Sequence, residues 1–281
     1  MFHTSDLHPP RALVCKTPEN PLESTGAYVR IPSQFQGHQS VVYQSTISEI
    51  GDVLIKVLKP HLGPQQSFDD VVELEVGLKQ EGAPVAELLS YHEWNDDGLT
   101  RNAAVYRYYS GGDLFTQILR LHHSKAISPQ RTEFIAYSMT SMLCYCLAHL
   151  HQKGWVHVDI KPENIFVSHD IESPDCQAYL GDFGNAVRVG TEICRFNTGT
   201  ESYFPKQDLG NFGYGPAQTS IDLYCVGKVL KKFEFIHALS LHARSVMQRL
   251  TAQVATQRPT AVEMLEIHLP AWSSHILSNT S

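Results

Sequence analysis

The chain has 281 residues, 42% of them hydrophobic, so it can bury a sizeable core as one large or two modest domains. Its net charge of −7 argues against nucleic acid or an anionic membrane as the main partner. Residues 1–20 lack the continuous apolar run of a signal peptide, and no apolar stretch of about 18 residues predicts a membrane span. We therefore expect a soluble protein.

The N-terminal part of the chain predicts a small sheet and one helix. Residues 1–27 are rich in Pro, Ser and Thr without periodicity, which predicts a flexible extension. Three segments rich in β-branched and aromatic residues predict strands, at residues 28–31, 40–47 and 53–58. Residues 67–79 predict a helix, because Ser67 is a suitable N-cap and acidic residues fill the first turn.

The next part predicts one more strand and then helices. Residues 103–109 have the composition of a strand, and residues 114–121 form a short amphipathic pattern. A long helix begins at Ser128-Pro129, which combines a good N-cap with proline in the first turn, and continues to His151.

The cysteines do not indicate a disulfide scaffold or a clear metal site. Six cysteines in a chain of this length are too few for a small disulfide-rich fold. Four residues of the long helix have the spacing of a metal site, namely Cys144, Cys146, His149 and His151. Cys146, however, falls on the apolar stripe of the helix, where a free thiol packs as a small hydrophobe. We therefore favour a packing role.

The stretch with the most chemical content is residues 157–167, which read H-V-D-I-K-P-E-N-I-F-V. It places the carboxylate of Asp159, the ammonium group of Lys161 and the carboxamide of Asn164 close together. Asp182-Phe183-Gly184 follows 18 residues after Asn164. This pairing of H-x-D-x-K-x-x-N with D-F-G resembles the catalytic loop and the metal-binding loop of the protein kinase family.

The resemblance implies a role for each of these residues. In phosphoryl transfer the protein mainly positions the reactants and neutralises phosphate charge. Asp159 would accept the proton of a substrate hydroxyl, and Lys161 would screen the moving phosphoryl group. Asn164 and Asp182 offer the hard oxygens that Mg²⁺ prefers beside nucleotide phosphates. Thr200, in a G-T-x-x-Y stretch, would brace Asp159 and Lys161. The alternative is a loop ion pair followed by an ordinary turn.

The resemblance extends to the strands that bind ATP in this family. Lys56 matches the lysine that meets the α and β phosphates, although an exposed strand lysine is the simpler alternative. The glycine-rich loop keeps only Gly37, because other residues occupy its two outer glycine positions. Val42 follows this loop and is assigned to the same site. Glycine normally permits close backbone approach, so the loss of the two outer glycines predicts looser phosphate cover. Leu54 replaces an alanine that lies against the adenine in this family, so we also expect a narrower adenine pocket.

A glutamate of the helix at residues 67–79 should pair with Lys56 in a kinase. Glu73 and Glu75 both qualify. We prefer Glu73, because its distance to the start of the next strand resembles the spacing of the family.

The segment after the strand at residues 103–109 resembles a kinase hinge. Tyr106 takes the gatekeeper position, and the backbone of Arg107 and Tyr108 would bond the adenine edge. Asp113 stands where an acid meets the ribose hydroxyls or a basic substrate side chain. An aromatic strand is also what plain core packing would give.

The C-terminal part contains one feature typical of the family and two departures. Asp222 matches the aspartate that anchors the backbone of the catalytic loop. Arg258 matches an arginine that pairs with the glutamate of an A-P-E motif, but Lys206 stands at that place. Another carboxylate must serve Arg258, and the candidates are Glu201, Asp208 and Glu263. Asp222 and Arg258 are only 36 positions apart, so the helix that commonly docks substrates and regulators should be reduced or missing.

Val158 replaces the arginine that ordinarily precedes the catalytic aspartate. That arginine makes a bidentate contact with a phosphate on the activation segment, which valine cannot make. We therefore expect activity that does not depend on phosphorylation of this segment. In its compactness and its lack of this arginine, the chain resembles the kinases that bacteria deliver into host cells or that large DNA viruses encode. An ordinary cellular kinase fits as well.

These observations predict an α+β, bilobal protein kinase-like fold. Residues 28–109 would form an N-lobe with a small antiparallel sheet, and residues 110–281 a mostly helical C-lobe. The expected activity is transfer of the γ-phosphate of ATP, with Mg²⁺, to Ser or Thr of a protein substrate in the cytoplasm of the producing or a host cell. A regulatory or host protein is a further expected partner. The alternatives are a catalytically weak binding scaffold and a small-molecule kinase of the aminoglycoside or choline type.

Overall fold

The computed structural model describes residues 16–24, 28–30, 40–58, 67–124, 126–194, 203–209 and 214–278. The chain divides into two compact units. The first, here called the sheet unit, comprises Met1–Leu62 and Leu88–Arg107. The second, here called the helical unit, comprises Gly63–Glu87 and Tyr108–Ser281.

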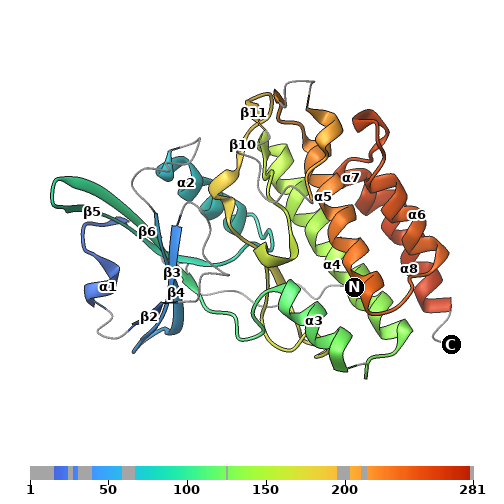
Figure 1. Ribbon diagram of the computed structural model, residues 1–281, viewed down its shortest axis with the longest axis horizontal. Coiled ribbons are helices and arrows are strands. Elements are labelled where there is room, and N and C mark those ends of the chain that lie inside the picture. Colours follow the sequence, from blue (N-terminus) through green and yellow to red (C-terminus); the bar gives the residue numbers. More distant parts are fainter. Residues whose placement is uncertain are drawn as a thin grey trace. The chain divides into compact units, whose positions relative to one another are not determined.

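The sheet unit contains a six-stranded sheet (Figure 1). In spatial order its strands are β1 (Lys16–Thr17), β5 (Leu88–Asp96), β6 (Leu99–Arg107), β4 (Gly51–Leu58), β3 (Ser40–Ile47) and β2 (Tyr28–Arg30). All neighbouring strands are antiparallel except β1, which pairs with β5 in parallel. The strands predicted at residues 40–47 and 53–58 are therefore confirmed. Besides the predicted antiparallel strands, the sheet contains β5, for which no bounds were predicted, and the added parallel strand β1.

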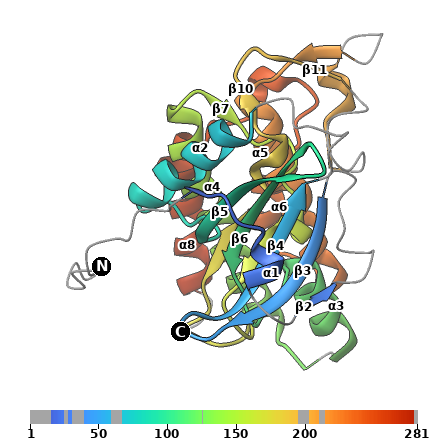
Figure 2. The ribbon, with the colours of Figure 1, turned by 90° about the vertical axis from the view of Figure 1, so that its left-hand side faces the viewer.

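One face of this sheet carries the apolar core of the unit. Alternate residues of β4 and β6 are buried there, namely Val53, Ile55, Ala103 and Val105. Leu22 of the short helix α1 (Pro21–Ser24) packs against this cluster, and Figure 2 shows α1 beside the strands. The back of the sheet is thus partly covered by a segment from before its first long strand.

This segment corrects the prediction of a flexible extension for residues 16–24. Thr17 pairs with His92 in the sheet. Thr17 Oγ1 and the Glu19 carbonyl oxygen, at 2.9 Å from the ring, both contact His92 Nδ1. The segment was hard to recognise because the strand is two residues long and the helix four, too short for any periodicity.

The helical unit is built around the long helix α4 (Pro129–Gln152), drawn in yellow-green in Figure 1. Its other helices are α2 (Phe68–Gln80), α3 (Leu114–Ser124), α5 (Thr219–Lys232), α6 (Leu241–Leu250), α7 (Ala261–Glu263) and α8 (Leu269–Ser278). A π-helical turn, Met264–His268, joins α7 to α8. Helix α4 contacts α5, α7 and α8. Ser67 and Ser128 cap α2 and α4 as predicted, accepting bonds from Asp70 N and Arg131 N.

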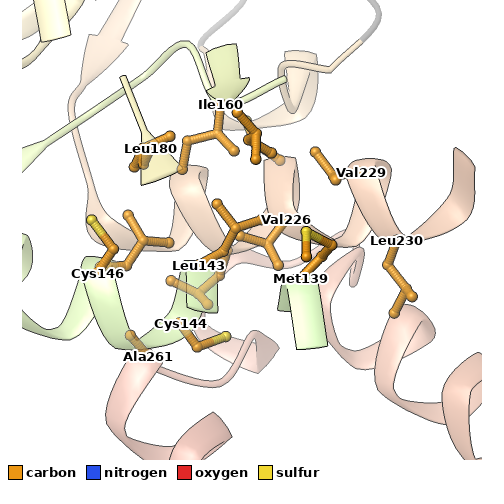
Figure 3. Close-up of a cluster of buried hydrophobic side chains, with 14 of the residues drawn as sticks. Met139, Leu143, Cys144, Cys146, Ile160, Leu180, Val226, Val229, Leu230 and Ala261 are labelled. Carbon is orange, nitrogen blue, oxygen red and sulfur yellow. The ribbon is translucent and has the colours of Figure 1, made fainter. Parts of the chain in front are cut away.

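Side chains of α4 and α5 meet in the core of this unit (Figure 3). Ile160, from the loop after β7 (Trp155–Val156), and Leu180, the last residue of β9 (Ala178–Leu180), join them. Cys144 and Cys146 are both fully buried, and burial raises the pKa of the Cys144 thiol to about 12. The apolar surroundings predicted for Cys146 are therefore confirmed.

Helix α2 belongs to the helical unit, which differs from the predicted N-lobe boundary at residue 109. Its buried residues Val71, Leu74 and Leu78 share one hydrophobic cluster with Leu143 of α4. Helix α2 is therefore grouped with the helical unit because its apolar face packs there, although the strands before and after it in the sequence belong to the sheet unit.

Three short two-stranded ribbons complete the helical unit. They pair β7 (Trp155–Val156) with β10 (Val187–Arg188), β8 (Ile165–Val167) with β9 (Ala178–Leu180), and β11 (Glu192–Cys194) with β12 (Tyr214–Pro216). Between α5 and Arg258, the described chain forms short 3-10 turns and the ten-residue helix α6. Among the helices that the structure describes, none has the length and apolarity that crossing a bilayer requires.

Candidate active site

The backbone of the loop at residues 157–164 is held by one buried carboxylate. Asp222, at the start of α5, accepts hydrogen bonds from His157 N to Oδ2 and from Val158 N to Oδ1, both at 2.9 Å. His151 Nε2 lies 2.9 Å from the same Oδ2. Asp222 is 0% exposed, so its charge is stabilised by these polar partners rather than by bulk solvent. The predicted anchoring role of Asp222 is confirmed.

Val158 has a left-handed backbone conformation, with φ of 59°. A β-branched residue rarely adopts this region, which costs roughly 1–2 kcal/mol for an ordinary side chain. The Asp222 carboxylate bonds the amides of Val158 and of the residue before it and so holds the loop in this shape. The Val158 side chain is only 3% exposed and belongs to the apolar core. It therefore packs into the core, whereas the arginine that the resemblance leads one to expect at this position would contact a phosphate on the activation segment.

His157 links this loop to the D-F-G segment. Its Nε2 lies 3.1 Å from the Gly181 carbonyl oxygen, and its Nδ1 accepts the Asp159 backbone N–H at 3.3 Å. Its ring contacts the buried Phe183 ring, with centroids 4.8 Å apart. The sequence signalled His157 only as part of the motif, whereas the structure gives it a distinct positioning role.

The Asp159 carboxylate receives several donors on one oxygen. Lys161 Nζ lies 2.9 Å from Oδ2, Asn164 Nδ2 lies 3.2 Å from it, and Asn185 Nδ2 lies 3.4 Å from it. The side chain is largely buried. These donors fix the orientation of the carboxylate, as a group that must accept a proton from a defined direction requires. Asn185 was not predicted, and its place directly after D-F-G was the only signal for it.

Asn164 and Asp182 lie at the same end of the β8–β9 ribbon. Asn164 Nδ2 also donates to the Asp159 carbonyl oxygen at 2.8 Å, so the amide oxygen points the other way. The Gly181 backbone N–H donates to the Asn164 carbonyl oxygen at 2.9 Å, and Asp182 follows with φ of 62°. The structure therefore places the two predicted metal ligands next to each other along the backbone pairing.

This donor set fits a magnesium ion that is shared with phosphates. Asn164 and Asp182 supply hard oxygens, and Mg²⁺ usually takes only one or two carboxylates from the protein. In the part of the chain that the structure describes, no group of three or more His, Cys, Asp and Glu side chains could hold a metal by itself. Asn164 and Asp182 together would supply one amide oxygen and one carboxylate to such an ion.

The sheet unit presents four predicted nucleotide residues on one face. In the antiparallel register, Val42 pairs with Lys56 and Leu54 with Tyr106. Directly paired residues point to the same side of a sheet, and Lys56 and Leu54 are two residues apart on β4. All four therefore lie on the face opposite the buried Val53 and Ile55 cluster, and all are half-buried.

The two candidate glutamates of α2 differ sharply in burial. Glu73 is exposed, whereas Glu75 is 3% exposed. A buried carboxylate must be compensated by a polar or charged group, and an exposed one need not be. Burial therefore favours Glu75 over our preferred Glu73, and the glutamate that pairs with Lys56 stays a prediction. Sequence spacing alone does not fix which of two nearby helix residues faces inward.

The predicted hinge coincides with the division between the units, which falls between Arg107 and Tyr108. Tyr109 begins the packed part of the helical unit, where its hydroxyl accepts the Glu87 N–H at 3.1 Å. Its ring stacks on the Tyr179 ring at 4.6 Å.

Asp113 serves as a helix cap. Its Oδ1 accepts the Thr116 N–H at 2.8 Å, and its Oδ2 accepts the Thr116 hydroxyl at 3.0 Å. A role with ribose or a basic substrate stays a prediction. Gly37 and Thr200 lie outside the described residues.

Arg258 finds its partner in Asp208, one of the three carboxylates considered. Its NH1 and NH2 atoms donate to the two carboxylate oxygens at 2.5 and 2.8 Å, a bidentate geometry. Its Nε also donates to the Ala252 carbonyl oxygen at 2.8 Å. Asp208 lies two residues after Lys206 and thus supplies the carboxylate that the missing A-P-E glutamate would provide.

Comparison with known proteins agrees with this geometry. The protein kinase domain matches residues 36–237, well over half of the chain. The chain belongs to the protein kinase family. The domain is 31% identical over 142 residues to serine/threonine-protein kinase ArnS of Sulfolobus acidocaldarius, covering 46% of this chain and 22% of ArnS. It is 31% identical over 175 residues to Aurora kinase C of Mus musculus, covering 62% of this chain and 57% of that kinase. The kinase domain thus spans only part of these relatives.

A solved structure shares the fold at low identity. ROP2 from Toxoplasma gondii, described as a virulence factor with a protein-kinase fold and no enzymatic activity, matches with a TM-score of 0.63. The match covers 89% of this chain and 81% of ROP2, at 13% identity. It supports the α+β kinase fold that the sequence predicted and carries no information on activity.

Proposed function

We propose that the chain is a protein kinase that transfers the γ-phosphate of ATP to Ser or Thr of a protein substrate. The observation that carries this proposal is the Asp159 carboxylate, oriented by Lys161 and Asn164 on a loop that Asp222 holds rigidly. Preorganised charge of this kind is what catalysis of phosphoryl transfer needs from a protein. A chain without catalytic work has no need for this combination.

Each residue has a separate task in this proposal. Asp159 accepts the proton that leaves the substrate hydroxyl, and Lys161 offsets negative charge on the transferred group. Protein kinases generally use ATP and magnesium, and Asn164 and Asp182 are the residues that would hold the metal here. A bound magnesium ion neutralises phosphate charge. Lys56 serves the phosphates, and we assign the accompanying glutamate to Glu75.

The inward-facing Val158 leads us to propose that phosphorylation of the activation segment is not needed for activity. The core packing of Val158 leaves no cation at this position to bind a phosphate. Substitution of Thr191, Thr198 and Ser202 together by alanine should leave turnover largely intact. A loss of about 10²-fold or more, the size expected when a working part of the site is removed, would refute this.

A binding scaffold is the second candidate, favoured by the altered glycine loop and by Leu54 in the adenine pocket. The two functions separate on ligand response. An active kinase should show thermal stabilisation by ATP with magnesium and then phosphate transfer to itself or to a generic protein. Stabilisation without transfer would identify the scaffold.

The proposal is tested by transfer of radiolabelled γ-phosphate in a cell lysate, with labelled proteins identified. Wild type is compared with Asp159→Ala and with a control, Asp175→Ala, which removes an exposed carboxylate from a surface loop. We expect labelling to fall by about 10²-fold or more in Asp159→Ala and to persist in the control. Equal labelling by wild type and Asp159→Ala would contradict the proposal.

A further inference from the structure

The helical unit contains a cavity of about 300 Å³ beside the C-terminal end of α5. Lysines and aromatic rings line most of it, namely Tyr203, Lys228, Lys231, Lys232, Glu234 and Phe235. We call it the lysine pocket. None of these residues has a role in the phosphoryl-transfer site described above.

The pocket concentrates positive charge on a protein whose net charge is −7. Lys228, Lys231 and Lys232 follow the i, i+3, i+4 spacing of one helix face, where like charges repel each other. Among the described residues, no carboxylate forms an ion pair with any of the three. Glu234 instead faces Arg244, at 3.7 Å.

Helix stability alone does not explain this cluster. Cations at a helix C-terminus are favoured by the helix dipole, which accounts for Lys231 and Lys232 in the last turn. Lys228 lies one turn earlier and is half-buried. Its pKa is lowered by burial and then by the charges of Lys231 and Lys232. An anion placed in the pocket would relieve this repulsion.

The aromatic side chains give the pocket a defined shape. Lys232 Nζ lies 5.5 Å from the centroid of the Tyr203 ring and 5.3 Å from that of the Phe235 ring. Tyr203 is 5% exposed, so it forms a fixed wall, whereas Phe235 is 62% exposed and forms an open rim. A peptide side chain could enter past Phe235 and meet oriented ammonium groups.

The pocket also lies next to the catalytic loop. The Tyr203 carbonyl oxygen accepts the Cys225 thiol at 3.5 Å. The same thiol lies against the Ile160 backbone, and burial together with the Asp222 and Asp159 carboxylates raises its pKa. One buried side chain therefore separates the pocket wall from the residue that follows Asp159.

We propose that the lysine pocket binds acidic side chains of the protein substrate and so directs the kinase to Ser or Thr residues flanked by Asp or Glu. The proposal rests on the proposed function, because it names the substrate class of the same site. Charge complementarity and proximity to the catalytic loop favour this occupant. A phosphorylated residue or free phosphate would use the same lysines and is distinguished by the test.

The test uses the full chain and four peptides with the same central serine, flanked by aspartates, by phosphoserine, by neutral residues or by lysines. Phosphorylation kinetics are measured for wild type and for the triple variant Lys228→Gln, Lys231→Gln, Lys232→Gln. The aspartate peptide should have a KM about tenfold below that of the neutral peptide. The triple variant should lose this advantage while its kcat and its KM for the neutral peptide change little.

Two controls separate charge from shape and from folding. The triple variant to arginine keeps the charge and should retain the preference for aspartate. Arg249→Gln removes one exposed cation from α6 outside the pocket and should change nothing. If the triple glutamine variant does not fold, Lys231→Glu, at an exposed position, provides the same comparison.

Binding of the labelled aspartate peptide is measured in parallel by fluorescence anisotropy at low and high salt, with inorganic phosphate as competitor. Binding that depends on the lysines and weakens with salt supports the pocket even if no phosphate is transferred, in which case only the proposed function fails. Equal KM values for aspartate and neutral peptides, or an unaffected triple variant, would overturn the inference. So would a clear preference for phosphoserine or phosphate over aspartate.

Discussion

The catalytic loop and the strands of the sheet unit hold their functional residues in different ways. At residues 157–164 the backbone is irregular, and it is held by the distant side chain of Asp222 and by Asn164 of the loop itself. On β4 and β6, Lys56, Leu54 and Tyr106 are placed by a regular backbone ladder. The first region therefore depends on the identity of particular side chains, and the second does not.

This difference accounts for where the chain departs from its family. A ladder of backbone hydrogen bonds keeps its register when Leu54 replaces alanine, because no side chain of the face is needed to hold it. In the loop, replacing Asp222 or Asn164 would leave buried backbone groups unsatisfied, at about 1–3 kcal/mol each. The loop motif is accordingly complete apart from Val158, whose apolar side chain packs in the core.

Removal of the loop anchor should have the largest effect. Asp222→Ala leaves the amides of His157 and Val158 without their acceptor and the positive φ of Val158 unsupported. We expect a loss of about 4 kcal/mol in the free energy of unfolding, measured by urea denaturation. Asp222→Asn, which keeps one acceptor oxygen, should lose less. A loss below about 1 kcal/mol for Asp222→Ala, the value typical of an ordinary exposed site, would contradict the claim that the loop depends on this side chain.

The Arg258–Asp208 pair tests the same principle at a second irregular segment. The Arg258 side chain is fully buried at this pair, so Asp208→Ala would strand its charge. We expect destabilisation of about 3 kcal/mol in the same assay. Asp170→Ala is a suitable control, because Asp170 forms an exposed ion pair with Arg120 and should contribute less than about 1 kcal/mol. Equal effects of the two variants would show that Asp208 does not anchor its segment.

Leu54→Ala probes the sheet face, where function and stability should separate. Leu54 is half-buried, so its truncation should cost only about 1 kcal/mol of stability. If Leu54 narrows the adenine pocket as proposed, ATP affinity measured by calorimetry should rise roughly fivefold, equivalent to about 1 kcal/mol. A weaker affinity in this variant would mean that the leucine contributes to nucleotide binding.

Gly77→Ala should give the smallest change, and it should be stabilising. Gly77 lies inside α2, and a Cβ built there would meet only the Lys153 side chain, at an ordinary 3.7 Å. Alanine in a helix interior is favoured over glycine by roughly 0.5–1 kcal/mol. Gly154→Ala is the matched control, because its φ of 74° should make alanine destabilising. Thermal unfolding of both variants should give shifts of opposite sign.

The sequence predicted the parts of the molecule whose signals are local. The H-x-D-x-K-x-x-N motif pointed to Asp159 and Asn164 as candidate site residues. The motif around Asp222 pointed to this aspartate as the residue that holds the backbone of the loop. For Arg258 it left three candidate partners, because an ion pair across 50 positions depends on the tertiary fold. The choice between Glu73 and Glu75 stayed open for a similar reason, since the burial of Glu75 also depends on the tertiary fold. The segment at residues 16–24 and the lysine pocket depend on contacts that no sequence period reveals.

The most direct measurement of the central claim is a single-turnover experiment on the purified chain with labelled ATP and magnesium. The transfer rate and the nucleotide affinity of wild type are compared with those of Asp159→Asn, which retains the shape of the side chain. The account predicts a rate that falls by about 10²-fold or more while ATP affinity changes little. Equal rates in the two proteins, or ATP bound by wild type without any transfer, would contradict it.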